Sequence, residues 1–386
     1  MSEQKGSGIF FSDVERLRAF CCIMVVLHHI IHACNLEFTF HLLPRCLWVG
    51  NGAIHVFFAI SGFFITYSLK NRVSATLGES FLDRLHASKE WLLIFYKKRF
   101  FRIVPVLLFV LVGTMIFYAC TEKDPGWFHP TLRSIVEIFC GSYNNSVSMF
   151  AETEKIHYGG FGLFWTLSVE MQFYMLWPLV LLMCKTDSRR AILSLVIGCA
   201  FLFVIQPLVT IFYGFKYYAI NNNVSELFLG SFFAYLCKDA DSICHDAKHR
   251  WFWMSLAAIL AMLIWIYPSI CNIESDVYFG KTVVSILSIG LTVLAIFIPG
   301  SFDFPVLNKL FNFLGRRSYA FYAVQLMLAN IIVWYTNSIY FSKESFSKYD
   351  FAMWQFVMFF VLLFVVTELV FRFIEKPFRK FGGGKS

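Results

Sequence analysis

Charged residues are scarce in this sequence. They make up 15% of its 386 residues, whereas hydrophobic residues make up 58%. A water-soluble protein of this length could not bury so much apolar surface, and the sequence therefore excludes a soluble enzyme or binding module. The apolar residues form repeated runs of about twenty residues, the length of a helix that crosses a bilayer. The composition predicts an all-α integral membrane protein.

Several common site signatures are also missing. The 11 cysteines show no paired ligand spacing, and Cys21 and Cys22 fall in an apolar run, where cysteine acts as a small hydrophobe. The sequence therefore predicts neither a disulfide framework nor a metal site. It has no Walker loop or dinucleotide fingerprint, and we expect no bound cofactor. The first apolar run lacks a small-residue cleavage site, which indicates a retained span rather than a signal peptide.

Positive charge is concentrated on one side of the predicted membrane. The net charge of +8 could indicate nucleic-acid binding, but most Lys and Arg fall in loops that alternate along the chain, the pattern of cytoplasmic loops. We therefore expect both termini to be cytoplasmic and no nucleic-acid partner. The polar stretch 70–89 is predicted to be a cytoplasmic loop. The predicted spans lie near 13–34, 47–69, 103–119, 161–183, 191–213, 219–237, 251–269, 281–299, 318–339 and 351–372.

These ten spans define one transmembrane domain. Residues 1–12 form a short cytoplasmic N-terminus, residues 13–374 the transmembrane domain, and residues 375–386 a basic cytoplasmic tail. Between the third and fourth spans, the half-apolar stretch 132–150 is too short and polar for a span. A re-entrant segment that lines a cavity is plausible there.

Three ionisable residues of the first span, Arg18, His28 and His29, have an informative arrangement. Arg18 and His29 are eleven residues apart, about 16 Å along a helix, and at about 100° per residue they share one face. His28 lies about 100° away from His29. Ionisable groups at membrane depth are costly, so the default interpretation is functional. The alternative is that the histidines only bond to neighbouring helices.

Other spans begin with further polar candidates. Arg99 and Arg102 lie three residues apart at the start of the third span, where two guanidiniums can bind a phosphate, or serve as stop-transfer charge. Pro105 is expected to kink or start that span. His55 is either a site residue or an interfacial histidine, and Glu170 needs a charged partner, such as Arg18 or a first-span histidine, or forms a structural pair. Farther along, Asn221, Asn222, Asn223 and Glu226 could bind sugar hydroxyls, although a helix cap is favoured.

Taken together, several segments resemble one family. RLRAFCCIMVVLHH, IHVFFAISGFFIT, KKRFFRIVP, LFWTLSVEMQFYMLWPL, LGRRSYAFY and FIEKPFR occur in the order seen in the membrane-bound acyltransferase 3 family, bacterial O-acyltransferases that decorate glycans. Its Arg-x10-His motif falls on Arg18 and His29, its Arg-x-x-Arg motif on Arg99 and Arg102, and its Ser-Val-Glu motif on Ser168 to Glu170. Three positions depart from the pattern: His55 and Met171 replace acids, and Gln325 replaces a histidine. We expect a stand-alone form without the esterase-like domain of many relatives.

The resemblance implies a function. The protein is expected to move an acyl group, most simply acetyl, from cytoplasmic acyl-CoA to a hydroxyl of a cell-envelope or surface glycan, such as O-antigen in lipopolysaccharide, capsule or another exopolysaccharide. The acceptor is a glycan or lipid-linked glycan, and the location is the bacterial inner membrane. His29 is expected to be the general base or acyl relay. Glu170 would orient or charge-balance His29 or Arg18, while Arg18, Arg99, Arg102, His55 and Ser168 would bind substrate.

Two other classes fit a polytopic membrane protein. A transporter or flippase of a glycan precursor would also have polar residues within its spans, but it should show an internal repeat of broken helices, which the sequence lacks. A receptor or assembly subunit of an envelope complex could retain such residues in a degenerate site. Transfer or hydrolysis of acyl-CoA by the purified protein would distinguish the enzyme from both.

Overall fold

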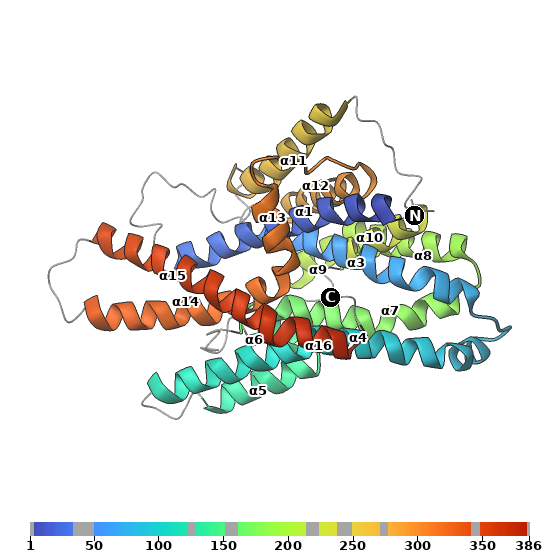
Figure 1. The fold of residues 1–386 in the computed structure, drawn as a ribbon. Helices are drawn as coiled ribbons and strands as arrows, with labels where there is room; N and C mark the ends of the chain where they lie inside the picture. The colour runs from blue at the N-terminus through green and yellow to red at the C-terminus, as the bar shows by residue number, and fades with distance from the viewer. Residues whose placement is uncertain are drawn as a thin grey trace.

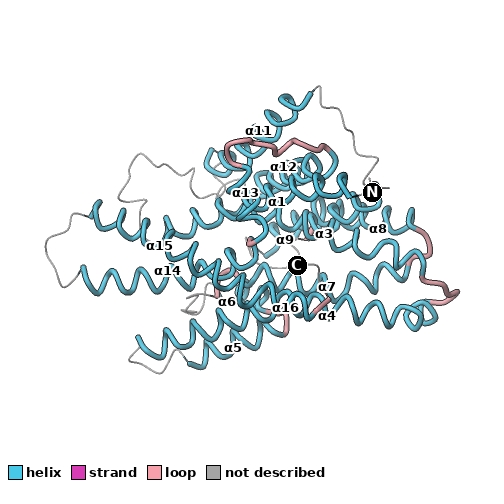
Figure 2. Tube along the Cα trace, viewed as in Figure 1, coloured by secondary structure: helices cyan, strands magenta, loops and turns pink. Residues whose placement is uncertain are grey.

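The computed structural model describes residues 4–33, 50–121, 128–150, 161–213, 224–237, 249–270, 277–340 and 348–383. Within these ranges all regular secondary structure is helical (Figure 2). Backbone N–H and C=O groups find no water in a bilayer, and a helix satisfies them within its own segment. Eight of the described helical segments are long and apolar enough to cross a membrane. The protein is an all-α integral membrane protein, as predicted.

Each of the ten predicted spans contains a described helix, and residues 34, 47–49 and 219–223 of these spans lie outside the described residues. The segments of α1 and α10 are not among the eight, and α10 is a shorter apolar helix of 12 residues. The side of the membrane on which the termini lie stays a prediction. The elements are α1 (Gln4–Ala33), α3 (Gly50–Ala75), α4 (Phe81–Thr121), α7 (Phe164–Met183), α8 (Asp187–Ala200) continued by η3 (Phe201–Ile205) and α9 (Gln206–Tyr213), α10 (Ser225–Leu236), α11 (Arg250–Ile270), α12 (Val277–Phe297), α14 (Ser318–Tyr340) and α15 (Lys348–Val370).

The predicted loop at 70–89 is wrong. Helix α3 runs to Ala75 and α4 begins at Phe81, which leaves only residues 76–80 between them. A capping box starts α4: Ser80 Oγ accepts a hydrogen bond from the Asp83 N–H at 3.1 Å, and the Asp83 carboxylate accepts one from the Ser80 N–H at 3.0 Å. Polarity alone therefore did not indicate a loop, because most of these polar residues belong to the end of α3 and the start of α4. Pro105 lies inside α4 rather than at its start.

The stretch expected to be re-entrant forms two short helices. These are α5 (Phe128–Phe139) and α6 (Tyr143–Phe150), joined by a turn at Gly141, where φ is 67°. Glycine adopts such a left-handed conformation without steric cost. Gln172 on α7 donates hydrogen bonds to the Gly141 carbonyl and, at 3.0 Å, to Asn144 Oδ1. The turn is thereby fixed against α7, and a re-entrant position in the bilayer stays a prediction.

Helix α3 lies at the centre of the bundle. It packs against α1, α7, α10 and α12 (Figure 1). Glycines permit a very close approach to α10: a Cβ at Gly62 would overlap the carbonyl of Leu227, and a Cβ at Gly230 would overlap the carbonyl of Ala59. Small residues allow helix backbones to meet in this way within membranes. Helix α3 therefore has one face locked to α10 and another free to line a site.

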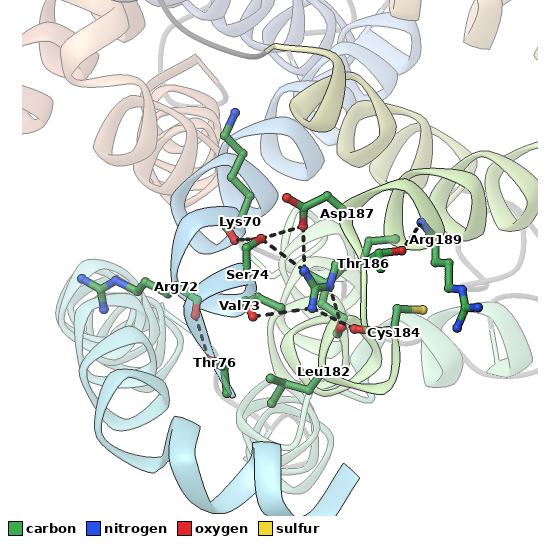
Figure 3. Close-up of polar contacts among 12 residues, drawn as sticks. Lys70, Arg72, Val73, Ser74, Thr76, Leu182, Cys184, Thr186, Asp187 and Arg189 are labelled. Atoms are coloured by element: carbon green, nitrogen blue, oxygen red, sulfur yellow. Dashed lines mark hydrogen bonds and ion pairs between the residues drawn. The ribbon is translucent and has the colours of Figure 1, made fainter. Parts of the chain in front are cut away.

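Two buried arginines close the end of α7. Arg190 is 1% exposed and donates to the carbonyls of Leu181 and Cys184 at 3.1 and 2.8 Å. It also pairs with Asp187, which accepts a hydrogen bond from Ser74 on α3 (Figure 3). Arg84 donates to the carbonyl of Leu182 at 2.7 Å. Cations at a helix C-terminus satisfy its unpaired carbonyls and its dipole, so these arginines join α3, α4, α7 and α8.

The helical part of the chain continues beyond residue 374. The elements after α12 are α13 (Asn308–Arg316), α14, α15, η7 (Phe371–Glu375) and α16 (Lys376–Phe381). Pro377 has no N–H, and its ring would clash with the carbonyl four residues earlier. A wider π turn, η7, precedes it and relieves that conflict. Helix α16 then packs on α4, where the rings of Phe101 and Phe378 stack at 6.3 Å and 17°.

Candidate active site

Two adjoining cavities lie among α1, α3, α4 and α7. The basic cavity, of about 330 Å³, contains the charged side chains Glu15, Arg18, Arg99, Arg102, Glu170 and Arg379. The inner cavity, of about 90 Å³, is lined mainly by aromatic and hydroxyl side chains, among them Phe57, Phe58, Thr166, Tyr319 and Tyr322. The two cavities share five lining residues: Arg18, Ser61, Arg102, Glu170 and Tyr174. A charged chamber therefore adjoins a smaller, mostly uncharged one.

Glu170 lies where the two cavities meet. Its Oε1 accepts a hydrogen bond from Ser61 Oγ on α3 at 2.8 Å and another from the Tyr174 hydroxyl, one helical turn farther along α7. Arg18 and Arg102 lie within electrostatic range of the Glu170 carboxylate. The expected pairing with Arg18 is therefore a charge interaction, while the hydrogen bonds come from two hydroxyls that the sequence had not singled out.

Three of the predicted arginines share the basic cavity. The spacing of Arg99 and Arg102 places both on the face of α4 that lines it, and Arg18 enters from α1. The Arg99 guanidinium lies over the Tyr174 ring, 5.0 Å from its centroid, and 5.3 Å from that of Phe95. The Nε of Arg18 is buried without a hydrogen-bond partner among the described residues. A buried donor of this kind favours an acceptor ligand.

Hydroxyl groups order the wall of the inner cavity. The Tyr322 hydroxyl and Thr166 Oγ1 are hydrogen-bonded at 2.9 Å, and the Tyr319 hydroxyl donates to the carbonyl of Ile103 at 2.8 Å. Ser168 is fully buried and lies outside the lining of both cavities, and its Oγ has no hydrogen-bond partner in the described part of the chain. The assignment of Ser168 to substrate binding stays a prediction.

His29 lies on the same helix as Arg18, as the spacing predicted. Its ring meets that of His28 edge to face, with centroids 5.1 Å apart. His29 is outside the lining of both cavities, and eleven helical residues place it about 16 Å along α1 from Arg18. The structure therefore separates His29 from the arginine group, and its catalytic role stays a prediction.

His55 belongs to a buried polar cluster on the α10 and α12 side of α3. Its Nδ1 lies 2.6 Å from Glu226 Oε1, and Glu226 also accepts hydrogen bonds from Ser225, at 2.9 Å, and from Ser285. His55 is 3% exposed and Glu226 is 0% exposed. Neither lines the two cavities. The predicted substrate-binding role of His55 stays untested, while Glu226 contacts a histidine rather than capping α10 through its side chain.

The other two departures from the family pattern also have defined surroundings. Gln325 is fully buried, and its Nε2 donates to the carbonyl of Tyr322 at 3.1 Å. Met171 packs against the hydrophobic core. Asn221, Asn222 and Asn223 lie outside the described residues.

The sequence also missed several site residues. Tyr174 follows Glu170 by four residues, a spacing that places both on one helix face. Arg379 had been assigned to the tail, yet it lines the basic cavity from α16, with Glu375 Oε1 at 3.5 Å. No group of three or more His, Cys, Asp or Glu side chains that could hold a metal ion occurs in the described part of the chain.

The fold and cavities define a multi-helix membrane protein with an arginine-lined chamber next to a half-buried carboxylate, Glu170. Residues 11–371 match the family model described as an acyltransferase domain, and the chain belongs to the acyltransferase 3 family.

Curated relatives are distant but aligned over almost all of this chain. The peptidoglycan O-acetyltransferase OatA of Listeria monocytogenes is 22% identical over 97% of this chain and 56% of its own length. The O-acetyltransferase OatA of Staphylococcus aureus is 22% identical over 98% of this chain and 59% of its own length. The putative peptidoglycan O-acetyltransferase YrhL of Bacillus subtilis is 21% identical over 97% of this chain and 55% of its own length. The chain thus spans little more than half the length of these relatives. No solved structure matches.

Proposed function

We propose that this protein is a membrane O-acyltransferase that moves an acyl group, most simply acetyl, from acyl-CoA to a hydroxyl of a cell-envelope glycan. The observation that carries the proposal is the basic cavity, with four arginines against two glutamates, next to a chamber of hydroxyl and aromatic side chains. An excess of guanidiniums favours a polyanionic ligand, and CoA carries three phosphate groups.

The donor enters from the cytoplasm in this proposal. The basic cavity lies at the end of the bundle formed by the start of α1, the end of α3 and helix α16, the end that the positive-inside pattern assigns to the cytoplasm. Acyl-CoA is made and kept in that compartment. The protein would then reside in the bacterial inner membrane, with the glycan acceptor presented from the opposite side.

The acceptor class is supported by the relatives. Two of the similar proteins carry peptidoglycan in their names. The acceptor that we propose is a glycan or lipid-linked glycan of the envelope. O-antigen, capsule and peptidoglycan are the candidate acceptors that the experiment compares. The lipid bilayer is the remaining partner, and no nucleic acid takes part.

The chemistry joins a hydroxyl to a thioester. The hydroxyl oxygen bonds to the acyl carbon, the carbon–sulfur bond breaks, and the hydroxyl proton passes through a base to the CoA thiolate. We assign the base to His29, on the strength of the Arg-x10-His motif, and charge balance near the donor to Glu170. Arg18, Arg99 and Arg102 would hold the phosphates, and Ser61 and Tyr174 would fix the Glu170 carboxylate through their hydrogen bonds.

The test is acyl transfer by the purified protein in detergent. Acetyl-CoA with a labelled acetyl group is supplied together with peptidoglycan fragments, O-antigen or capsule oligosaccharide, and the product is detected by mass spectrometry. Labelled ester on one glycan, with stoichiometric release of free CoA, is expected. A flippase or an assembly subunit would release no CoA thiol, and that result across all three acceptors would overturn the proposal.

A further inference from the structure

The C-terminal helix α16 supplies a charged side chain to the basic cavity. Arg379 lines this cavity together with Arg18, Arg99 and Arg102. The sequence places Arg379 in a basic segment after the last span, where Lys and Arg normally act as topology signals. Only the fold shows that Arg379 faces the chamber while its neighbour Lys380 is exposed.

Helix α16 is fixed in place on α4. The rings of Phe378 and Phe101 stack, and a Cβ at Gly382 would lie only 3.0 Å from the Cβ of Phe101. The π turn η7 ends at Glu375, which is 2% exposed and lies one helical turn before Arg379. Glu375 Oε1 and Arg379 Nη1 are 3.5 Å apart. The guanidinium is therefore held at the cavity wall by a docked helix and a buried carboxylate.

The four arginines lie at different depths. Arg18 and Arg102 line both cavities, whereas Arg99 and Arg379 line only the basic one. The Arg99 guanidinium is covered by the Tyr174 and Phe95 rings, while the Arg379 side chain is 34% exposed. Arg379 is therefore the arginine of this group nearest the mouth.

The donor has a matching order of phosphates. In acyl-CoA the thioester is at one end, the diphosphate lies beyond the pantetheine arm, and the 3′-phosphate of the adenosine is the phosphate at the far end. With the thioester directed through the inner cavity toward the His29 end of α1, the diphosphate meets the deeper arginines. The 3′-phosphate is left at the mouth, beside α16.

We propose that Arg379 binds the 3′-phosphate of the CoA donor, with Glu375 as its positioning residue. This rests on the proposed function, because it assumes a CoA thioester in the basic cavity. It assigns to the C-terminal helix a part in donor selection: Arg379 would distinguish CoA from dephospho-CoA, which lacks only that phosphate.

The experiment measures binding of CoA and of dephospho-CoA to the full chain in detergent. Wild type is expected to bind CoA about 10- to 100-fold more tightly than dephospho-CoA, the range for one charge-assisted contact. In Arg379→Ala the affinity for CoA should fall to that for dephospho-CoA, which itself should be unchanged. Arg379→Lys should restore part of the difference, because it retains charge without the guanidinium fork.

Lys380→Ala is the matched control. It removes the same charge from the adjacent, exposed position and should keep the full preference for CoA. A preference that survives in Arg379→Ala, with the variant folded by thermal melting, would overturn the assignment and leave the donor proposal standing. Equal wild-type affinity for the two nucleotides would overturn it as well. Failure of wild type to bind either nucleotide would instead remove the donor proposal, and this inference with it.

Discussion

Ser61 Oγ donates a hydrogen bond to Glu170 Oε1 at 2.8 Å, across the contact between α3 and α7. Both residues line both cavities. The bond holds the carboxylate at the boundary of the basic chamber instead of leaving it to pair fully with the arginines. A carboxylate so placed can counter the charge of the donor site while facing the smaller chamber.

Loss of the α4 arginines should weaken donor binding. Arg99→Ala or Arg102→Ala is expected to lower the affinity for CoA by about 10- to 100-fold, because each removes charge-assisted hydrogen bonds to phosphate. Substitution by Lys should rescue only partly. Isothermal titration with CoA measures the effect, and Lys97→Ala, an exposed neighbour of equal charge, is the control. Unchanged affinity in both alanine variants would reduce the pair to a topology signal.

Removal of His29 should abolish transfer without preventing insertion. His29→Ala is expected to reduce glycan acylation by about 10²- to 10⁴-fold, the usual contribution of a general base. Donor binding should persist, because His29 lies outside the lining of the basic cavity. His28→Ala is the matched control, with the same chemistry about 100° around α1. Near-normal acylation in His29→Ala at equal membrane abundance, or a loss confined to His28→Ala, would contradict the assignment of the general base to the His29 face of α1.

Glu170→Gln separates charge from hydrogen bonding. The amide oxygen can still accept hydrogen bonds from Ser61 and Tyr174, but the negative charge opposite the arginines is lost. Transfer should fall by at least about 100-fold, while CoA affinity should stay equal or rise, since the cavity becomes more positive. Binding and single-turnover rates are measured on the same preparation. A parallel loss of CoA binding would assign Glu170 to donor binding or folding instead.

The His55–Glu226 pair should matter for stability. His55→Ala leaves the buried Glu226 carboxylate without its histidine partner, a loss of about 1–3 kcal/mol or more, so the substitution is expected to lower the melting temperature in detergent. His55→Asp, which restores the acid typical of the family, would place two carboxylates together and should destabilise more. The exchange His55→Asp with Glu226→His should recover much of the loss. If the double variant melts no higher than His55→Asp alone, the two side chains do not stabilise the protein through their mutual contact.

Topology gives a further prediction. Both termini should be cytoplasmic, because the Lys and Arg clusters alternate between loops. A cysteine introduced at Lys97 should be protected from an impermeant reagent in intact cells, and one at Lys155, which lies outside the described residues, should react. The native exposed cysteines Cys120 and Cys140 are replaced by Ser for the assay. Labelling of both positions from outside would contradict this topology.

The sequence predicted the helices well, because apolar runs of membrane length admit few other structures. It also placed Arg18, Arg99, Arg102 and Glu170 in one site, through motif order. Spacing along a single helix worked for Arg99 and Arg102 because they share one face.

Contacts between distant helices could not be read in the same way. Glu226 is 171 residues from its partner His55, and nothing in the local pattern of α10 indicates which helix it meets. Arg379 could not be told from a topology signal, because it lies among other basic residues after the last span. Arg190 is 1% exposed, since its guanidinium caps the end of α7. Hydropathy and charge give each segment its depth, but not its neighbour.

The backbone contact between α3 and α10 limits how the protein can move. Since Gly62 and Gly230 leave no room for even a methyl group between the two helices, sliding them would bring other side chains against the opposing backbone, and parting them would open a void. We therefore expect the pair to move as one rigid body. An opening that admits a glycan to the inner cavity would then come from helices on the other face of α3.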